Sequence, residues 1–272
     1  MSAQVVSREH RQTWRRADGR RAALALLDYS NLVSEEAEGD SSLMRHFMVE
    51  LVRAVTSLAP QIEYLAIRAY GGWLDRGSVT SGASKAMRAL EGSDPFPIAH
   101  PSRRAILHGE VRLANALLSV PEVEFVDTYR VREGPPRIRL AGSPVPGGCA
   151  SDPSACPAAI LKRFTRSTRK NCPASGCAVT CGDAFKTYEQ KMVDTLIACD
   201  LVEAGSSPDL DLVALLTCDT DLLPPLVYAS SMRRTELAVI TPDPCWRSHH
   251  VEILNGIGVH LLPAESSYVD TR

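Results

Sequence analysis

The stretch DLVALLTCDTD, residues Asp211–Asp221, contains five consecutive apolar residues followed by a threonine and two nearby aspartates. An uninterrupted apolar run of this length is typical of a strand buried on both faces, as in a parallel sheet covered by helices. In open sheets of this kind, ligands bind outside the carboxyl ends of the strands. Asp219 and Asp221 are expected there, and paired carboxylates raise each other's pKa unless a cation holds them ionised. We interpret the stretch as half of a divalent-metal site, and an Asx turn that caps the next helix is the alternative.

Strand and helix patterns alternate along the rest of the chain, which predicts an α/β fold with a doubly wound, mostly parallel sheet. Strands are expected over Ala22–Leu27, Ile62–Ala69, Val123–Val131, Leu212–Leu216, Glu236–Ile240 and Val259–Leu262. Helices are expected over Ser41–Leu58, Ala83–Leu90, Ser102–Leu118, Phe185–Ala204, Leu222–Met232 and Trp246–Asn255, with a hairpin arm over Arg137–Leu140.

The composition is that of a globular protein, because 272 residues with a 44% hydrophobic fraction can bury a sizeable core. The longest early apolar run, Ala22–Leu27, is too short for a signal peptide or a membrane span. We therefore expect a soluble cytoplasmic protein with no membrane-bound part. The sequence leaves the oligomeric state open, a homo-oligomer included, and indicates no protein partner.

Charge is distributed unevenly although the net charge is only −2. Residues 1–22, which include a basic N-terminal leader over residues 1–21, carry a net +4, and residues 129–171 carry a net +7. The remainder is strongly acidic. This segregation favours basic appendages that contact phosphates beside a body that holds carboxylates, and solvated basic loops are the alternative.

Residues 142–185 differ from the two flanking parts of the α/β domain, 22–141 and 186–272, because they are rich in cysteine and poor in apolar residues. A small segment of this kind needs disulfides or a structural metal ion to be stable. In a reducing compartment, tetrahedral Zn²⁺ held by thiolates is the usual solution. We expect four ligands among five cysteines, and buried thiols without metal are the alternative. The expected ligands are Cys172, Cys177, Cys181 and Cys156, which closes the shorter loop, with Cys149 as the alternative fourth ligand.

Three segments bring acids to one expected edge of the sheet: Asp28 after the first strand, Asp194 early in a helix, and the Asp219–Asp221 pair. Together with the nearby polar residues Asn31, Thr217 and Lys191, they have the composition of a Mg²⁺ or Mn²⁺ site. Water on such an ion can attack a phosphodiester. Asp200 lies on the apolar stripe of the helix that carries Asp194, and a carboxylate in that position needs a partner. Asp200 either belongs to the acidic site in the crevice or makes a buried hydrogen bond to the backbone.

These residues form motifs that resemble those of NYN domains in the PIN-like nuclease superfamily. Those domains carry Asp-Gly-x-Asn, Lys-Gly-x-Asp and Ser/Thr-Gly-Asp-x-Asp, whereas this chain replaces the three glycines by Tyr29, Met192 and Cys218. The order of the motifs matches over residues 22–262, and similar bacterial members carry cysteines before the Lys-x-x-Asp helix. The matching segments are Asp28-Tyr29-Ser30-Asn31, Lys191-Met192-Val193-Asp194 with Asp200, and Thr217-Cys218-Asp219-Thr220-Asp221.

The resemblance implies a metal-dependent endoribonuclease with the NYN fold. Its expected metal ligands or water activators are Asp28, Asp194, Asp219 and Asp221, with Asn31 and Thr217 orienting them. Lys191 is expected to contact phosphate or to hold a carboxylate ionised. RNA is the expected partner, and a catalytically silent RNA-binding or scaffold protein is the competing hypothesis. The residues expected to contact RNA phosphates are Arg163, Arg166, Arg169 and Lys170.

Two other metal-using α/β families fit the first motif less well. Domains of the von Willebrand A type need a second hydroxyl where this chain has Leu32. Haloacid-dehalogenase-like phosphatases need an acid where it has Ser30.

Overall fold

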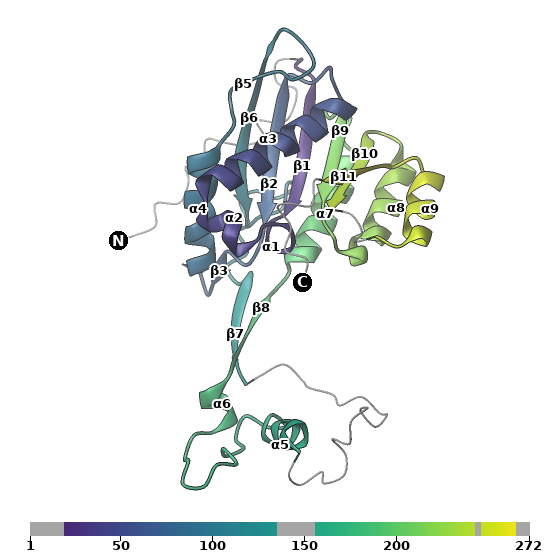
Figure 1. Ribbon diagram of the computed structural model, residues 1–272. Helices are drawn as coiled ribbons and strands as arrows, with labels where there is room; N and C mark the ends of the chain where they lie inside the picture. The colour runs from purple at the N-terminus through teal and green to yellow at the C-terminus, as the bar shows by residue number, and fades with distance from the viewer. Residues whose placement is uncertain (1–18, 135–155, 243–245, 265–272) are drawn as a thin grey trace. The chain divides into compact units, whose positions relative to one another are not determined.

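The computed structural model describes residues 19–134, 156–242 and 246–264. These residues form two compact units (Figure 1). The smaller unit is Tyr129–Gln190, and the larger unit contains the described residues before and after it. Most of the basic leader, the expected hairpin arm over Arg137–Leu140, and Cys149 lie outside the described residues.

A seven-stranded sheet forms the centre of the larger unit, in the order β11-β10-β9-β1-β2-β6-β5. Neighbouring strands are parallel except for β5 and β6, which are antiparallel. The α/β fold with a mostly parallel sheet is thus confirmed. The strands are β1 (Ala22–Asp28), β2 (Tyr64–Tyr70), β5 (Ile98–Ala99), β6 (Ile106–Ala114), β9 (Leu212–Leu216), β10 (Glu236–Pro242) and β11 (His260–Ala264).

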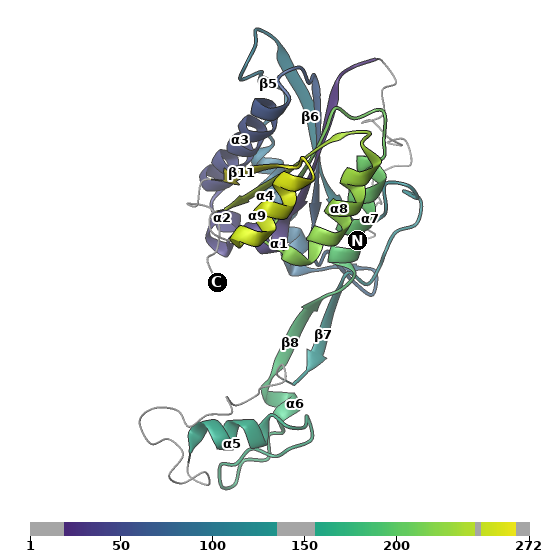
Figure 2. The same cartoon turned by 90° about the vertical axis from the view of Figure 1, so that its right-hand side faces the viewer.

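Helices cover both faces of this sheet, and Figure 2 shows α3 on one side and α7 and α8 on the other. Alternate residues of β1 enter two separate apolar clusters, one with α3 and α4 and one with α7, α8 and α9. All of β1 and β9 is buried for this reason. The helices are α1 (Tyr29–Leu32), α2 (Glu35–Gly39), α3 (Ser41–Leu58), α4 (Ser81–Ser93), α7 (Val193–Gly205), α8 (Leu223–Met232) and α9 (Ser248–Gly256). A short hairpin of β3 (Leu74–Asp75) and β4 (Ser78–Val79) and the 3₁₀ helix η1 (Thr220–Leu222) complete the unit.

The helix expected over Ser102–Leu118 is wrong, because this segment contains β6, which pairs along its length with β2. Gly109 shows why the strand is required at this position. A Cβ atom there would lie 2.4 Å from the backbone oxygen of Leu65 and 2.6 Å from the ring of Phe96. The close approach of β2 therefore needs a glycine, and glycine inside a helix is unfavourable by about 1 kcal/mol.

Two further expectations fail where the chain enters and leaves the smaller unit. The strand expected over Val123–Val131 begins only at Tyr129, as β7 (Tyr129–Glu133). The helix expected over Phe185–Ala204 begins only at Val193, because Lys186–Gln190 is instead strand β8. β7 and β8 pair with each other in antiparallel orientation. Backbone pairing between segments distant in the chain thus sets the bounds of both elements.

The smaller unit consists of this two-stranded ribbon, α5 (Pro157–Phe164) and α6 (Cys181–Ala184). Its apolar contacts are few, and the rings of Phe164 and Phe185 pack at 5.8 Å between centroids. The two ends of the larger unit that flank the smaller one lie next to each other, because the Lys191 N–H donates a 2.9 Å hydrogen bond to the Thr128 carbonyl.

Candidate active site

The carboxyl ends of β1 and β9 lie side by side, because these strands pair in parallel with Leu27 opposite Leu216. The residues that follow, Asp28 and Thr217, are both buried. Thr217 Oγ1 donates a 2.7 Å hydrogen bond to Asp28 Oδ2, and Asn31 Nδ2 donates to the same oxygen at 2.9 Å. The two residues expected to orient an acid therefore hold the carboxyl group of Asp28.

The Asp28 carboxyl group has a strongly perturbed pKa. The pKa of this group is raised to about 6, mainly by burial. The hydrogen bonds from Thr217 and Asn31 oppose this rise, and the charges of Asp194 and Asp219 add to it. Its second oxygen, Oδ1, is buried and has no hydrogen-bond partner among the described residues. A buried carboxylate near like charges, with one oxygen unpaired, is an electrostatically unfavourable arrangement that a cation would relieve.

Asp219 and Asp221 lie in the turn after β9. Thr217 Oγ1 accepts a 2.9 Å hydrogen bond from the Asp219 N–H, and Asp219 Oδ1 accepts one of 2.8 Å from the Asp221 N–H. Asp219 thereby caps η1, so the Asx turn named as an alternative is present. The same turn also places Asp219 near Asp28, so capping and membership of an acidic cluster coexist here.

Asp194 joins the cluster from the first turn of α7. The pKa of Asp194 is raised, mainly by partial burial, and the charges of Asp219 and Asp221 add to this rise. Asp28 responds to the charges of Asp194 and Asp219, so Asp219 acts on both of the other acids. The structure therefore brings together the four acids that the sequence analysis assigned to one edge of the sheet.

The two residues before α7 have different surroundings. The side chain of Lys191 is half-buried and makes no ion pair with a carboxylate in the described ranges. Met192 is exposed and has φ 61° and ψ −3°, in the left-handed region. That conformation costs a residue with a Cβ atom about 1–2 kcal/mol. Helix α7 therefore begins at a strained position, two residues before Asp194.

Asp200 lies on α7, the helix that also carries Asp194, and belongs to a separate buried network. Its Oδ2 accepts a 2.6 Å hydrogen bond from the Tyr70 hydroxyl and lies 3.1 Å from Arg68 Nη2. Its Oδ1 accepts a 2.7 Å hydrogen bond from the Leu118 N–H. Of the two interpretations of Asp200, the structure shows the buried hydrogen bond to backbone, together with an ion pair.

Arg68 and Tyr70 were not among the residues selected from the sequence. A signal for them exists, because Arg68 interrupts the otherwise apolar strand β2 and a buried cation needs a carboxylate. Asp200 is the complementary residue on an apolar helix stripe. The pair could have been matched before the structure was known.

The donor set of the acidic cluster suits a hard divalent cation, because carboxylate oxygens are the ligands that Mg²⁺ and Mn²⁺ prefer. The unpaired Oδ1 of Asp28 supports such an ion. Across residues 19–134, 156–242 and 246–264, no three His, Cys, Asp or Glu side chains lie close enough to share a metal ion. The four acids thus lie near one another without forming a closed coordination shell.

The cysteines of the smaller unit lie around a short hairpin in which Asn171 pairs with Thr180. The Cys172 N–H donates to Val179 O and the Cys181 N–H donates to Lys170 O, both at 2.8 Å. Cys181 is buried, which raises the pKa of its thiol. The residues Cys156, Cys172, Cys177 and Cys181 form no disulfide.

In the larger unit, by contrast, Cys218 is disulfide-bonded. Its sulfur lies 3.9 Å from Thr241 Oγ1 at the end of the neighbouring strand β10.

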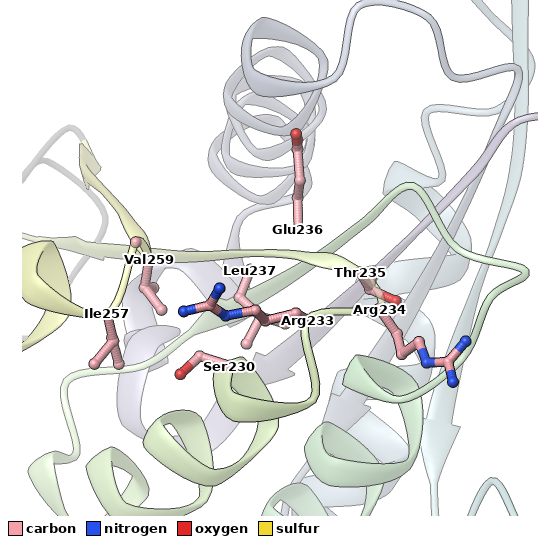
Figure 3. Close-up of a pocket in the computed structure, with 9 residues that line it drawn as sticks. Ser230, Arg233, Arg234, Thr235, Glu236, Leu237, Ile257 and Val259 are labelled. Carbon is pink, nitrogen blue, oxygen red and sulfur yellow. The ribbon is translucent and has the colours of Figure 1, made fainter.

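A cavity of about 280 Å³ lies elsewhere in the larger unit, at the amino end of β10 (Figure 3). Its lining includes Ser230, Arg233 and Val259, while the side chains of Arg234 and Glu236 point away from Arg233. None of the four clustered acids lines this cavity. It is therefore separate from the candidate active site.

Comparison with protein-family models, curated proteins and solved structures finds no match to this chain. Among the helices in the described part of the chain, none is long and apolar enough to cross a membrane.

Proposed function

We propose that this protein is a metal-dependent ribonuclease that hydrolyses RNA phosphodiester bonds at the acidic edge formed by β1, β9 and α7. The observation that carries the proposal is the environment of Asp28. This carboxyl group is buried, has its pKa raised to about 6, and responds to the charges of Asp194 and Asp219. Acids gathered at the carboxyl ends of parallel strands are characteristic of functional sites in α/β proteins.

In this proposal Asp28, Asp194, Asp219 and Asp221 hold Mg²⁺ or Mn²⁺. The bound ion would supply an activated water and would neutralise charge on the phosphate. Thr217 and Asn31 fix the orientation of Asp28 through their hydrogen bonds. The proposal assigns phosphate binding to Lys191, because it has no carboxylate partner among the described residues.

The backbone of Met192 supports the resemblance to NYN domains. Met192 stands where those domains carry a glycine, and its φ of 61° is one that glycine adopts without steric penalty. Tyr29 and Cys218, at the other two glycine positions, do not have positive φ. The conformation expected of a glycine is thus retained at one of three positions.

A catalytically silent RNA-binding protein is the second candidate. The observation that favours it is that no three potential ligands among the described residues converge on one point. Under this alternative the fold and the basic residues bind RNA, and the acids have no chemical role.

A cleavage assay separates the two candidates. Wild type, Asp219→Asn and Glu91→Gln are compared on single-stranded and structured RNA with Mn²⁺ and with EDTA. Glu91 is an exposed acid on α4 and serves as the matched control. We expect Mn²⁺-dependent cleavage by wild type and Glu91→Gln, and at least a 100-fold loss in Asp219→Asn, as when a positioned catalytic group is removed. Absence of metal-dependent cleavage in the wild type would favour the silent protein.

The smaller unit is proposed to bind one structural Zn²⁺ through Cys172, Cys177, Cys181 and Cys156, with Cys149, outside the described residues, as the alternative fourth ligand. The support is that the Asn171–Thr180 hairpin fixes the backbone at two of these cysteines, and that so small a unit needs a staple. Elemental analysis of protein purified without a metal-affinity tag tests this directly. One zinc per chain is expected, whereas a content near zero, with Cys172→Ser as stable as wild type, contradicts it.

A further inference from the structure

The smaller unit contains a continuous stretch, residues 156–182, that has five cationic side chains and no carboxylate. All five are exposed. We call them the basic surface: Lys162, Arg163, Arg166, Arg169 and Lys170. Arg163 donates weakly to a backbone oxygen of its own helix, and the other four make no ion pair with any carboxylate in the described ranges.

Two nearby carboxylates of the same unit are already engaged. Asp183 forms a capping box with Thr180, and this hydrogen bonding lowers the pKa of Asp183. Glu189 pairs with Arg132 at 2.7 Å across the β7–β8 ribbon. The charge of the basic surface is therefore not compensated by these acids, and such a surface attracts an anionic partner.

Backbone hydrogen bonds hold the basic surface in place. The Lys170 N–H donates to Ser167 O at 3.0 Å, closing a turn after α5. Two further bonds tie this turn to the following segment, from Cys181 N–H to Lys170 O and from Gly182 N–H to Thr168 O, each 2.8 Å. The cations thus project from the last turn of α5 and from the ordered turn that follows it, and the exposed hydroxyl groups of Ser167 and Thr168 lie among them.

Aromatic side chains are absent from the exposed positions described for this unit. Phe164 and Phe185 are half-buried against each other. Its large exposed apolar residues are aliphatic, namely Val131, Leu161 and Val179. Proteins that bind single strands without sequence preference stack bases on exposed aromatic rings. The basic surface offers charge and hydroxyl groups without such rings.

We infer that the basic surface docks on the sugar–phosphate backbone of double-helical RNA. The inference rests on the proposed function for the choice of RNA, and it specifies the substrate class as structured RNA. A double helix presents about twice the charge per unit length of one strand. Duplex RNA is recognised mainly by phosphate and 2′-hydroxyl contacts, which cations with interspersed hydroxyl groups can supply.

The test measures equilibrium binding by fluorescence anisotropy in EDTA, so that no cleavage occurs. The probes are a 20-base-pair RNA duplex, one of its strands alone, the corresponding DNA duplex, and phosphatidylserine vesicles. The test variant replaces Lys162, Arg166, Arg169 and Lys170 by Gln. The matched control replaces four exposed cations of the larger unit, namely Arg45, Lys85, Arg88 and Arg104, and changes the net charge equally.

Four phosphate contacts contribute a slope of about −3.6 to log K against log salt, which is about 100-fold in affinity between 50 and 200 mM salt. We expect the wild type to bind the RNA duplex at least tenfold more tightly than the strand, and the test variant to lose most of this salt dependence. The control variant should retain it. Circular dichroism melting should be unchanged in both variants, because the replaced side chains are exposed.

Four results would overturn the inference: equal or tighter binding of the single strand, equal binding of the DNA duplex, an unchanged salt slope in the test variant, or vesicle binding that depends on the same cations. Asp219→Asn separates this inference from the proposed function. If wild type and Asp219→Asn both bind duplex RNA through the basic surface but neither cleaves, the proposed enzyme is wrong and the inference stands. If the wild type cleaves RNA while the test variant binds the RNA duplex as tightly as the wild type does, the inference is wrong and the proposed enzyme stands.

Discussion

Replacing Asp28 by Asn should stabilise the protein at neutral pH while removing the proposed nuclease activity. The folded-state pKa of Asp28 is about 6, above the ordinary value of 3.8. Between these pH values the folded state binds more protons than the unfolded state, so the stability contributed by this group is complete below 3.8 and is lost as pH rises through 6. The difference corresponds to an upper limit of about 3 kcal/mol at pH 7, at 1.36 kcal/mol per pKa unit.

Asparagine carries no charge and retains an oxygen that can accept the hydrogen bonds from Thr217 and Asn31. Urea unfolding in EDTA should therefore show Asp28→Asn as more stable than wild type by about 1–3 kcal/mol at pH 7, with the difference shrinking towards pH 4. The exposed-acid variant Glu91→Gln should match wild type at both pH values.

Mg²⁺ provides a second arm of the same experiment. An ion that binds only the folded wild type adds about 2.7 kcal/mol at a concentration 100 times its dissociation constant. Asp28→Asn should gain much less stability from Mg²⁺. The difference in unfolding free energy between this variant and the wild type should therefore become smaller or change sign. A variant less stable than wild type at pH 7 in EDTA, by the same margin as at pH 4, would refute the electrostatic argument.

Three further substitutions give sharp outcomes. Thr217→Val should raise the pKa of Asp28 from about 6 to about 7 or 8, because a hydrogen bond to a charged group contributes about 1.5–3 kcal/mol. Carbon-13 NMR titration measures this pKa, and the control Thr217→Ser, which keeps the hydroxyl group, should leave it near 6. An unchanged pKa in Thr217→Val contradicts the prediction. Met192→Gly should raise the free energy of unfolding by about 0.5 kcal/mol, since removal of left-handed strain exceeds the added entropy of the unfolded chain; a loss of stability would show that Met192 is not strained. Asp200→Ala should lower the free energy of unfolding by about 3–5 kcal/mol, because Arg68 is left buried without its partner. The double variant Arg68→Met/Asp200→Leu removes both charges and should be more stable than Asp200→Ala in urea unfolding. Equal stability of the two variants would show that the ion pair is not the cause.

The elements that could be predicted from the sequence are those whose burial is uniform. β9 matches its expected bounds, Leu212–Leu216, because both of its faces are covered and every residue is apolar. α3 matches Ser41–Leu58, since a single apolar stripe faces the sheet and Asp40 caps its start. In both cases the local pattern and the tertiary environment favour the same structure.

The elements that failed are those whose partners are distant in the chain. β6 carries half-buried residues at most positions and is held as a strand by β2. Lys186–Gln190 is a strand because β7 pairs with it, and the apolar helical stripe of the sequence begins only at Val193. For the site, the sequence could assign four acids to one edge from strand topology. It could not assign the hydrogen bonds of Asp28 or its raised pKa, because these depend on side-chain geometry.

The hydrogen bond between Thr128 and Lys191 has a consequence for protein engineering. The chain leaves the larger unit and returns to it at adjacent positions, so a segment of almost any length can be accommodated between them without altering the sheet. Deleting Tyr129–Gln190, or replacing it by another segment, should therefore leave the strand order of the larger unit unchanged. The junction between Thr128 and Lys191 is thus a suitable position for grafting a foreign module.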